Sequence, residues 1–358
     1  MVRTFDTPFS QQIGIDHPLI QAPMAGTSTV ALAVAVANSG GLGSFAVGTL
    51  APEAIRAGVA AIRQQTGRPF NVNLFVIEPA APTAEELRAA LDLLAPIRAE
   101  LGLEPGAVPA KFSENYEEQL ETVIELKVPL VSATFGLMSA AAIERLHAAG
   151  SRVIGTATNV AEALAWERNG ADFICAQGAE AGGHRGTFIG EAQDSMIGTM
   201  ALVPQVADAV RLPVIAAGGI MDGRGIAAAL ALGAQAVQLG TAFVACAEAA
   251  SHPAWKALLR DAADTSTRTT RAFSGRYARG IVNQYMRRMA PHEAGLPAYP
   301  VQNALTTEIR KAAGAANRPD YLSLWAGQAA GMLRRRAPGI QAAELVAQLL
   351  RETDAALT

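Results

Sequence analysis

The chain has 358 residues, of which 50% are hydrophobic and 17% charged, and its formal net charge is −3. This apolar content, without a heptad or Gly-X-Y period, excludes a disordered, coiled-coil or collagen-like chain. The small net charge gives no electrostatic reason to expect a nucleic acid or a membrane surface as partner. The length fits an α/β barrel of about 250 residues with one smaller domain.

The two cysteines, Cys175 and Cys246, lie in apolar stretches and lack the spacing of metal ligands. We therefore expect buried, reduced thiols and no metal site. Residues 1–10 lack the apolar core of a signal peptide, and the longest apolar run, 30–37, is too short for a membrane helix of about 18 residues. We predict a cytoplasmic protein whose oligomeric state the sequence leaves open.

Eight short apolar segments rich in Val, Ile and Phe recur along the chain, separated by helix-like stretches that often end in Gly. They are 18–24, 42–48, 68–76, 128–136, 152–158, 172–178, 213–219 and 236–243. Strands that alternate with helices form parallel βαβ units, and eight such units predict a (β/α)8 TIM barrel. A doubly wound sheet is the alternative, but the turn APMAGTST after the first segment lacks the G-x-G-x-x-G pattern.

Two segments do not fit this repeat. Both follow predicted barrel strands, so both emerge at the carboxyl-terminal face of the barrel, where barrel active sites lie. We predict a barrel formed by 1–76 and 119–249, and a smaller, mainly helical substrate or cap domain formed by 77–118 and 250–358. The alternative is that these segments brace the barrel or form an oligomer contact.

Polar residues at the ends of two predicted strands are candidates for ligand binding. Asn71 and Asn73 share one face of the third strand and need partners, either from a ligand or from the barrel interior. After the sixth strand, His184 and Arg185 lie in the glycine-rich stretch 176–188. A histidine above a barrel is suited to act as a base, and the alternative is a solvent-exposed loop residue.

Glycines follow the seventh strand at Gly218 and Gly219 and end the eighth in the stretch 238–241. Their backbone N–H groups could bind a phosphate, as this part of a barrel often does, or they could only form tight turns. Nearby, Glu180 and Asp222 could serve as acid–base groups or as helix caps. Because the sequence lacks a serine elbow, a Walker A loop and an H-E-x-x-H motif, a cofactor would have to supply the chemistry.

Several of these segments resemble, in chain order, the nitronate monooxygenases, formerly called 2-nitropropane dioxygenases. The resembling motifs are QAPMAG (21–26), NSGGLGS (38–44), FNVNLFV (70–76), TFG (134–136), AQGAEAGGHRGTF (176–188), PVIAAGGIMDGRG (213–225), QLGTAF (238–243) and FSGRYARGIVNQ (273–284). The resemblance implies an FMN-dependent enzyme of nitroalkane detoxification. Its reaction would be the oxidation of alkyl nitronates, notably propionate 3-nitronate, with dioxygen to a carbonyl compound and nitrite or nitrate.

The resemblance also implies roles for individual residues. His184 would be the catalytic base, and Tyr299 and Lys311 would line the substrate mouth. The residues implied to bind FMN are Met24, Asn73, Gln177, Gly182, Gly219, Gln238, Leu239, Gly240 and Thr241. The alternatives are an NAD(P)H-dependent flavin reductase acting on a quinone or enoyl thioester, and a non-catalytic flavin-binding barrel. The GGHRG loop favours the monooxygenase over the quinone reductases, in which this loop is typically AGHPG.

Overall fold

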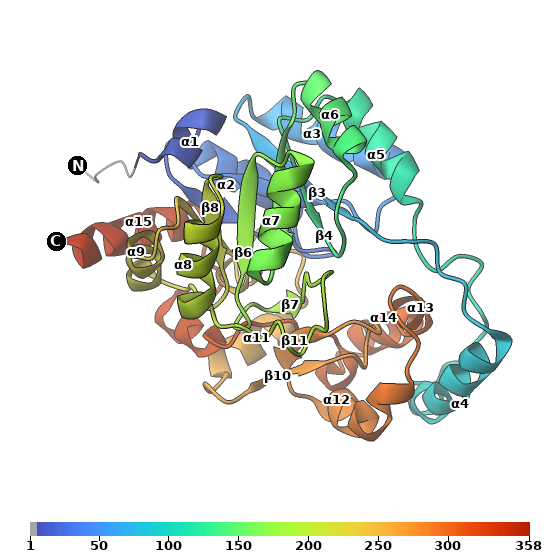
Figure 1. Cartoon of the computed structure of the whole chain (residues 1–358). Coiled ribbons are helices and arrows are strands. Elements are labelled where there is room, and N and C mark those ends of the chain that lie inside the picture. Colours follow the sequence, from blue (N-terminus) through green and yellow to red (C-terminus); the bar gives the residue numbers. More distant parts are fainter. Residues whose placement is uncertain (1–5) are drawn as a thin grey trace.

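A closed barrel of eight parallel strands forms the centre of the molecule in the computed structural model, which describes residues 6–358 (Figure 1). The strand order is β1, β9, β8, β6, β5, β4, β3, β2, and a parallel bridge between Ile20 and Leu42 joins the last strand to the first. The strands are β1 (Leu19–Gln21), β2 (Gly43–Ala46), β3 (Phe70–Phe75), β4 (Leu130–Thr134), β5 (Arg152–Ala157), β6 (Phe173–Gln177), β8 (Val214–Ala217) and β9 (Ala236–Leu239). The predicted TIM barrel is confirmed, and the doubly wound sheet is wrong because the sheet closes.

Helices surround the barrel because each strand turns one row of apolar side chains outward. On β3, Val72 and Leu74 face the helices while Asn71 and Asn73 face the interior, as the two-residue period of a strand requires. The covering helices are α2 (Val30–Asn38), α3 (Pro52–Gln65), α5 (Tyr116–Glu125), α6 (Ala140–Ala148), α7 (Val160–Asn169), α8 (Thr199–Ala209), α9 (Gly223–Ala231) and the short α10 (Thr241–Val244).

The barrel interior is apolar at one end and polar at the other. Ile20, Ile154 and Ile215 fill the amino-terminal end, and Phe9 of α1 (Pro8–Ile13) closes it, with its ring edge-on to Phe173 at 4.8 Å. Toward the carboxyl ends of the strands, the inward positions are polar or small. They are Asn73, Ser132, Thr156, Gln177, Ala217 and Gln238. These side chains form the floor of the barrel mouth.

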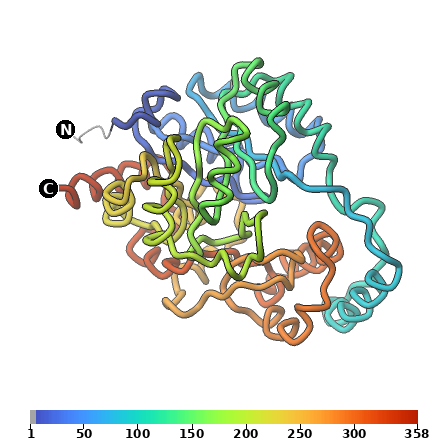
Figure 2. The backbone as a smooth tube through the Cα atoms, viewed as in Figure 1, coloured from blue at the N-terminus to red at the C-terminus, as the bar shows by residue number. Residues whose placement is uncertain are grey.

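Segments from both predicted additions meet in a second hydrophobic cluster outside the barrel. α4 (Ala84–Glu100) contributes Leu94 and Ile97, which share this cluster with Phe273, Tyr285 and Ile309. In Figures 1 and 2, α4 lies far from both chain termini, beside the orange helices of the C-terminal part. Those helices are α12 (Gln284–Met289), α13 (Val301–Leu305) and α14 (Thr307–Ala315), with the 3-10 turns η1 (Ala290–Gly295) and η2 (Pro319–Tyr321).

The rest of the C-terminal part packs on the barrel. η3 (Ala330–Arg335) lies on α11 (Pro253–Asp261), and the last helix, α15 (Ala342–Leu357), lies on α9 and α2. A small antiparallel sheet joins β7 (Gly183–His184), β11 (Ala278–Ile281) and β10 (Thr267–Thr270), and the sequence did not reveal it. The division of function between barrel and cap stays a prediction.

Both cysteines are buried and free, as expected. Across residues 6–358, no helix is both long and apolar enough to span a membrane. In the same residues, no group of three or more His, Cys, Asp or Glu side chains is placed to hold a metal ion. Residues 1–5, the start of the segment examined for a targeting signal, lie outside the described residues, and the cytoplasmic location stays a prediction.

Candidate active site

Two hydrogen-bonded supports fix the backbone at His184. On one side, His184 and Ala278 pair in the antiparallel ladder between β7 and β11. On the other, the amide side chain of Gln177 donates to the His184 carbonyl at 2.9 Å and accepts from the Gly186 N–H at 2.8 Å. The position of His184 is therefore fixed jointly by the end of β6 and by β11, which belongs to the C-terminal part of the chain.

The His184 ring lies in an aromatic enclosure. Its Nε2 is 2.8 Å from Ser274 Oγ, and the rings of Phe135, Tyr299 and Trp325 have their centroids 5.4, 5.8 and 5.4 Å away. Burial, with the nearby charges of two arginines, lowers the pKa of His184 to about 3. The imidazole is therefore neutral near pH 7, the form that can accept a proton. A solvent-exposed loop histidine, the alternative interpretation, does not fit this enclosure.

Four arginines give this region a positive charge. Arg185, Arg276, Arg279 and Arg310 have no carboxylate oxygen within 4 Å in the described part of the chain. Their bonded donors go mostly to backbone carbonyls, such as those of Gln177 and Gly178 for Arg185, with side-chain oxygens as further acceptors for Arg279 and Arg310. Glu162 and Glu180 act on three of these charges from beyond 4 Å. Because burial strengthens charge interactions, a set of cations that no carboxylate contacts favours an anionic ligand.

Four of the residues predicted to bind FMN lie close together at the barrel mouth. A Cβ built on Gly182 would lie 2.5 Å from the backbone nitrogen of Gly327, whose N–H donates to Thr241 Oγ1 at 2.9 Å. A Cβ on Gly240 would lie 3.9 Å from the sulfur of Met24. The segments that contain Met24, Gly182, Gly240 and Thr241 therefore converge.

Backbone N–H groups at the ends of β8 and β9 are available to a ligand. Gly218 and Gly219 have φ of +116° and +72°, which side chains with a Cβ rarely adopt. Within residues 6–358, no hydrogen bond uses the N–H of Gly218, Gly219, Gly240 or Thr241. Such a group of unpaired N–H donors fits the oxygens of a phosphate.

The two carboxylates considered as acid–base groups cap helices instead. Glu180 accepts from the N–H of Thr199 at 2.8 and 2.9 Å and from its hydroxyl at 2.8 Å, at the start of α8. Asp222 is the N-cap of α9 and accepts from the N–H groups of Arg224 and Gly225. These contacts occupy their oxygens in helix capping.

The polar strand residues find partners inside the barrel. Asn71 and Asn73 both donate to Ser132 Oγ at 2.9 Å. Gln238 donates to Cys175 Sγ at 3.4 Å. Leu239 is 1% exposed and packs in the outer core, so only its backbone can face the mouth. Flavin binding by Asn73, Gln177, Gln238 and Leu239 stays a prediction.

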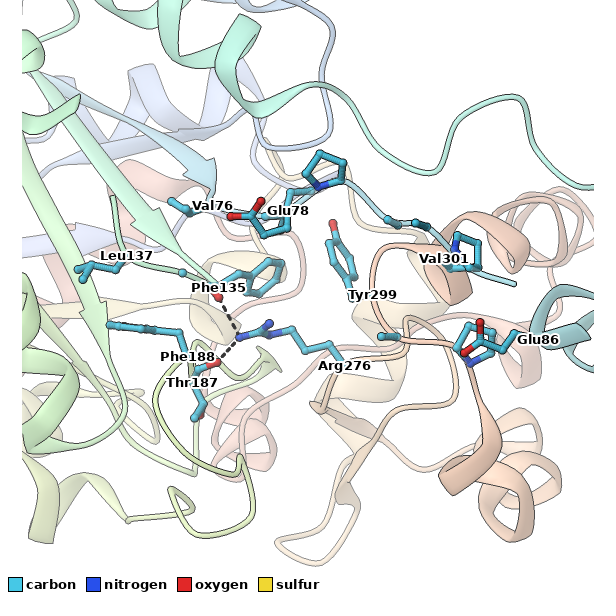
Figure 3. Close-up of a pocket in the computed structure, with 18 of the residues that line it drawn as sticks. Val76, Glu78, Glu86, Phe135, Leu137, Thr187, Phe188, Arg276, Tyr299 and Val301 are labelled. Carbon is cyan, nitrogen blue, oxygen red and sulfur yellow. Dashed lines mark hydrogen bonds between the residues drawn. The ribbon is translucent and has the colours of Figure 1, made fainter. Parts of the chain in front are cut away.

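Two cavities adjoin the enclosure, and Tyr299 lines both. The first, of about 720 Å³, is also lined by Phe135, Arg276 and the segment 76–82 (Figure 3). The second, of about 600 Å³, is lined by residues that include Lys111 and the exposed Lys311. Of the two predicted substrate residues, Tyr299 therefore lies beside His184, while Lys311 lines a different cavity, and both roles stay predictions.

The sequence interpretation missed five residues that surround the base. They are Phe135, Ser274, Arg276, Arg310 and Trp325. Phe135 also has an uncommon positive φ of 80°. The first three lie in the motifs TFG and FSGRYARG, and Arg310 directly precedes the predicted Lys311, so these four had a usable signal, whereas the region around Trp325 contained none.

Comparisons with known proteins identify the family of this chain. The family model "Nitronate monooxygenase" matches residues 6–352. A probable nitronate monooxygenase of Staphylococcus aureus (strain Newman) is 42% identical over 320 residues, covering 89% of this chain and 90% of the relative. A nitroalkane oxidase from Streptomyces ansochromogenes has a TM-score of 0.89 at 39% identity, covering 98% of each chain. FabK from Thermotoga maritima has a TM-score of 0.77 at 30% identity, covering 98% of this chain and 97% of that one. The chain belongs to the nitronate monooxygenase family of oxidoreductases.

Proposed function

We propose that this protein oxidises alkyl nitronates, and the nitroalkanes from which they form, with FMN and dioxygen, to a carbonyl compound and nitrite or nitrate. The observation that carries the proposal is a neutral, enclosed His184 close to Arg276 and Arg310, cations that have no carboxylate partner. A neutral base with cations nearby suits a substrate that becomes, or already is, an anion. Membership of the nitronate monooxygenase family supports the oxidation of nitronates.

The residues present fit FMN. The unpaired N–H groups of Gly218, Gly219, Gly240 and Thr241 would hold its phosphate. Met24, Asn73, Gln177, Gly182 and Gln238, at the floor and rim of the barrel mouth, would hold the remainder. When bound, FMN would supply the redox chemistry, by accepting electrons from the substrate and passing them to dioxygen.

His184 would act as base toward a neutral nitroalkane. The C–H bond next to the nitro group breaks, the proton goes to the imidazole, and the electron pair forms the C=N bond of the nitronate. The hydroxyl of Ser274 donates to the carbonyl of Arg276 at 3.1 Å. Because the Ser274 proton is used in that bond, Ser274 Oγ accepts a hydrogen bond from His184 Nε2–H. The lone pair that can take a proton is then on His184 Nδ1. A nitronate arrives without that proton, and His184 then helps to orient the anion.

The test is an anaerobic mixing experiment with the FMN-loaded protein. Propionate 3-nitronate is added in one cuvette and NADH in another, and the visible absorbance of the flavin is recorded. We expect the nitronate to bleach the flavin and NADH to leave it unchanged. Rapid bleaching by NADH alone would instead support the second candidate, an NAD(P)H-dependent flavin reductase. Failure to bind FMN would contradict both.

A further inference from the structure

Arg276 holds its guanidinium group at the wall of the 720 Å³ cavity (Figure 3). Its Nε donates to the carbonyl of Arg185 at 2.9 Å, and its Nη2 donates to the carbonyls of Phe135 and Thr187. The third nitrogen, Nη1, has no acceptor among residues 6–358 and is not among the fully buried atoms. The guanidinium is thus fixed by three carbonyls and keeps one nitrogen for a ligand.

No carboxylate oxygen lies within 4 Å of Arg276 in the described structure, and the buried Glu162 acts on its charge only from a greater distance. The cavity is lined by two acids, Glu78 and Glu86. Glu86 accepts from the N–H and hydroxyl of Thr83 at the start of α4, and Glu78 is exposed. Burial lowers the pKa of Arg276 to about 10, so the group still carries its charge at neutral pH. A fixed cation that no carboxylate contacts is a site for an anion.

The position of this cation relates it to the base. Its guanidinium carbon lies 4.4 Å from the centroid of the Phe135 ring, and that ring lies 5.4 Å from the ring of His184. Tyr299, which lines the same cavity, is in edge contact with Phe135 at 5.1 Å. One aromatic ring therefore separates the cation from the residue that would take the proton.

We propose that Arg276 determines specificity for anionic substrates, by donating from Nη1 to an oxygen of a nitronate or carboxylate group in this cavity. The choice of nitronate rests on the proposed function, whereas recognition of a carboxylate can be measured without turnover. A hydrogen bond between two charged groups is about twice as strong as one between neutral groups. A neutral nitro group on the same carbon skeleton therefore gains less from Arg276.

The test compares one substrate in its two charge states with an unreactive anion. Arg276→Gln and the wild-type holoenzyme are assayed at about pH 8, where His184 is neutral, with 1-nitropropane and with its nitronate. Binding of butyrate, a carboxylate of the same shape, is measured by calorimetry. We expect the variant to lower kcat/KM for the nitronate and the affinity for butyrate about 10-fold or more. The KM for 1-nitropropane, whose nitro group is neutral when it binds, should change less than about 3-fold, whereas its kcat should fall because the transition state for proton removal becomes anionic.

Arg271→Gln is the matched control. Arg271 lies in the same segment, donates to the carbonyls of Gly275 and Leu296, and lies over the ring of Tyr277, but it does not line the cavity. We expect this variant to keep the wild-type preference for the anion. A KM for 1-nitropropane raised as much as that for the nitronate in Arg276→Gln, unchanged butyrate binding, or the same butyrate loss in Arg271→Gln would overturn the proposal.

Two further outcomes remain decisive. If Arg276→Gln does not fold, Arg276→Lys replaces it, because lysine keeps the charge but loses the planar fork. An unchanged ratio of nitronate KM to nitroalkane KM, with unchanged butyrate affinity, in that variant would then contradict the proposal. If the wild-type enzyme oxidises neither compound, the proposed function fails, and the butyrate titration still decides whether Arg276 binds an anion.

Discussion

The pKa of a histidine falls well below its usual value when aromatic rings enclose the imidazole and guanidinium groups lie nearby. For His184, burial comes first and the charges of Arg276 and Arg310 follow, and together they lower the pKa from 6.5 to about 3. At a pH between these two pKa values, His184 is protonated in the unfolded chain but neutral in the folded protein. The contribution of His184 to the free energy of unfolding therefore decreases as the pH falls from 6.5 toward 3.

The pH dependence of proton abstraction follows from this shift. Because His184 stays neutral well below pH 6.5, we expect kcat/KM for freshly prepared 1-nitropropane to lack an acid limb near 6.5 and to decline only as the pH approaches the pKa of about 3. Steady-state rates at constant ionic strength measure this. His184→Asn should still bind FMN and should lose nitroalkane turnover. An acid limb near pH 6.5, or unchanged turnover in His184→Asn, would contradict the assignment of the base.

The sequence could predict His184 but not its surroundings. A histidine between glycines after a strand is a local pattern, and local patterns can be read from one chain. The lack of carboxylate partners around Arg276 and Arg310 is a property of three-dimensional packing. In sequence, an arginine in a polar loop looks the same whether its charge is solvated or buried.

At the scale of elements, apolar runs predicted all eight barrel strands because each buries both faces. The three strands of the small sheet were missed because they are short and partly polar, as in TRTT for β10, and β7 has only two residues. Such strands exist only by pairing with a distant partner. The loop that follows β7 is held in another way, by the buried carboxylate of Glu162 on α7.

Glu162 ties the loop after His184 to the barrel. It accepts from the N–H of Thr158 at 2.6 Å and from the N–H groups of Phe188 and Ile189 at 2.5 and 2.9 Å. Glu162→Gln puts an NH2 group against one of these donors, so we expect a loss of about 1–3 kcal/mol in unfolding free energy. Hydrogen exchange at residues 188–189 should become faster. The exposed Glu144→Gln is the control, and unchanged exchange in Glu162→Gln would refute the anchoring role.

At the scale of the whole molecule, α15 completes the helical layer around the barrel. It packs on α9 and α2, and Leu345 and Leu349 are fully buried there. The sequence grouped this helix with the cap segment 250–358 because its amphipathic pattern predicts a buried face but not what covers that face. The last helix of the chain therefore stabilises a barrel whose first strand lies near the amino terminus.

Shortening a buried side chain of α15 should destabilise the barrel itself. We expect Leu349→Ala to lower the free energy of unfolding by about 2–5 kcal/mol, the range for a buried leucine. Leu357→Ala, at a side chain that is 48% exposed, should change it by less than about 0.5 kcal/mol. Chemical denaturation measures both. Equal small effects would show that α15 is dispensable for the barrel.

The order of these parts along the chain has a consequence for biosynthesis. The N–H groups that would hold a phosphate are complete by Thr241, whereas Ser274, Arg276 and Tyr299 come later in the chain. A ribosome releases the amino-terminal part first, and domains tend to fold in that order. The groups that would hold the phosphate are therefore made before the residues that enclose the site, and before α15, which stabilises the barrel. The newly made enzyme would become reactive only after synthesis of its last third.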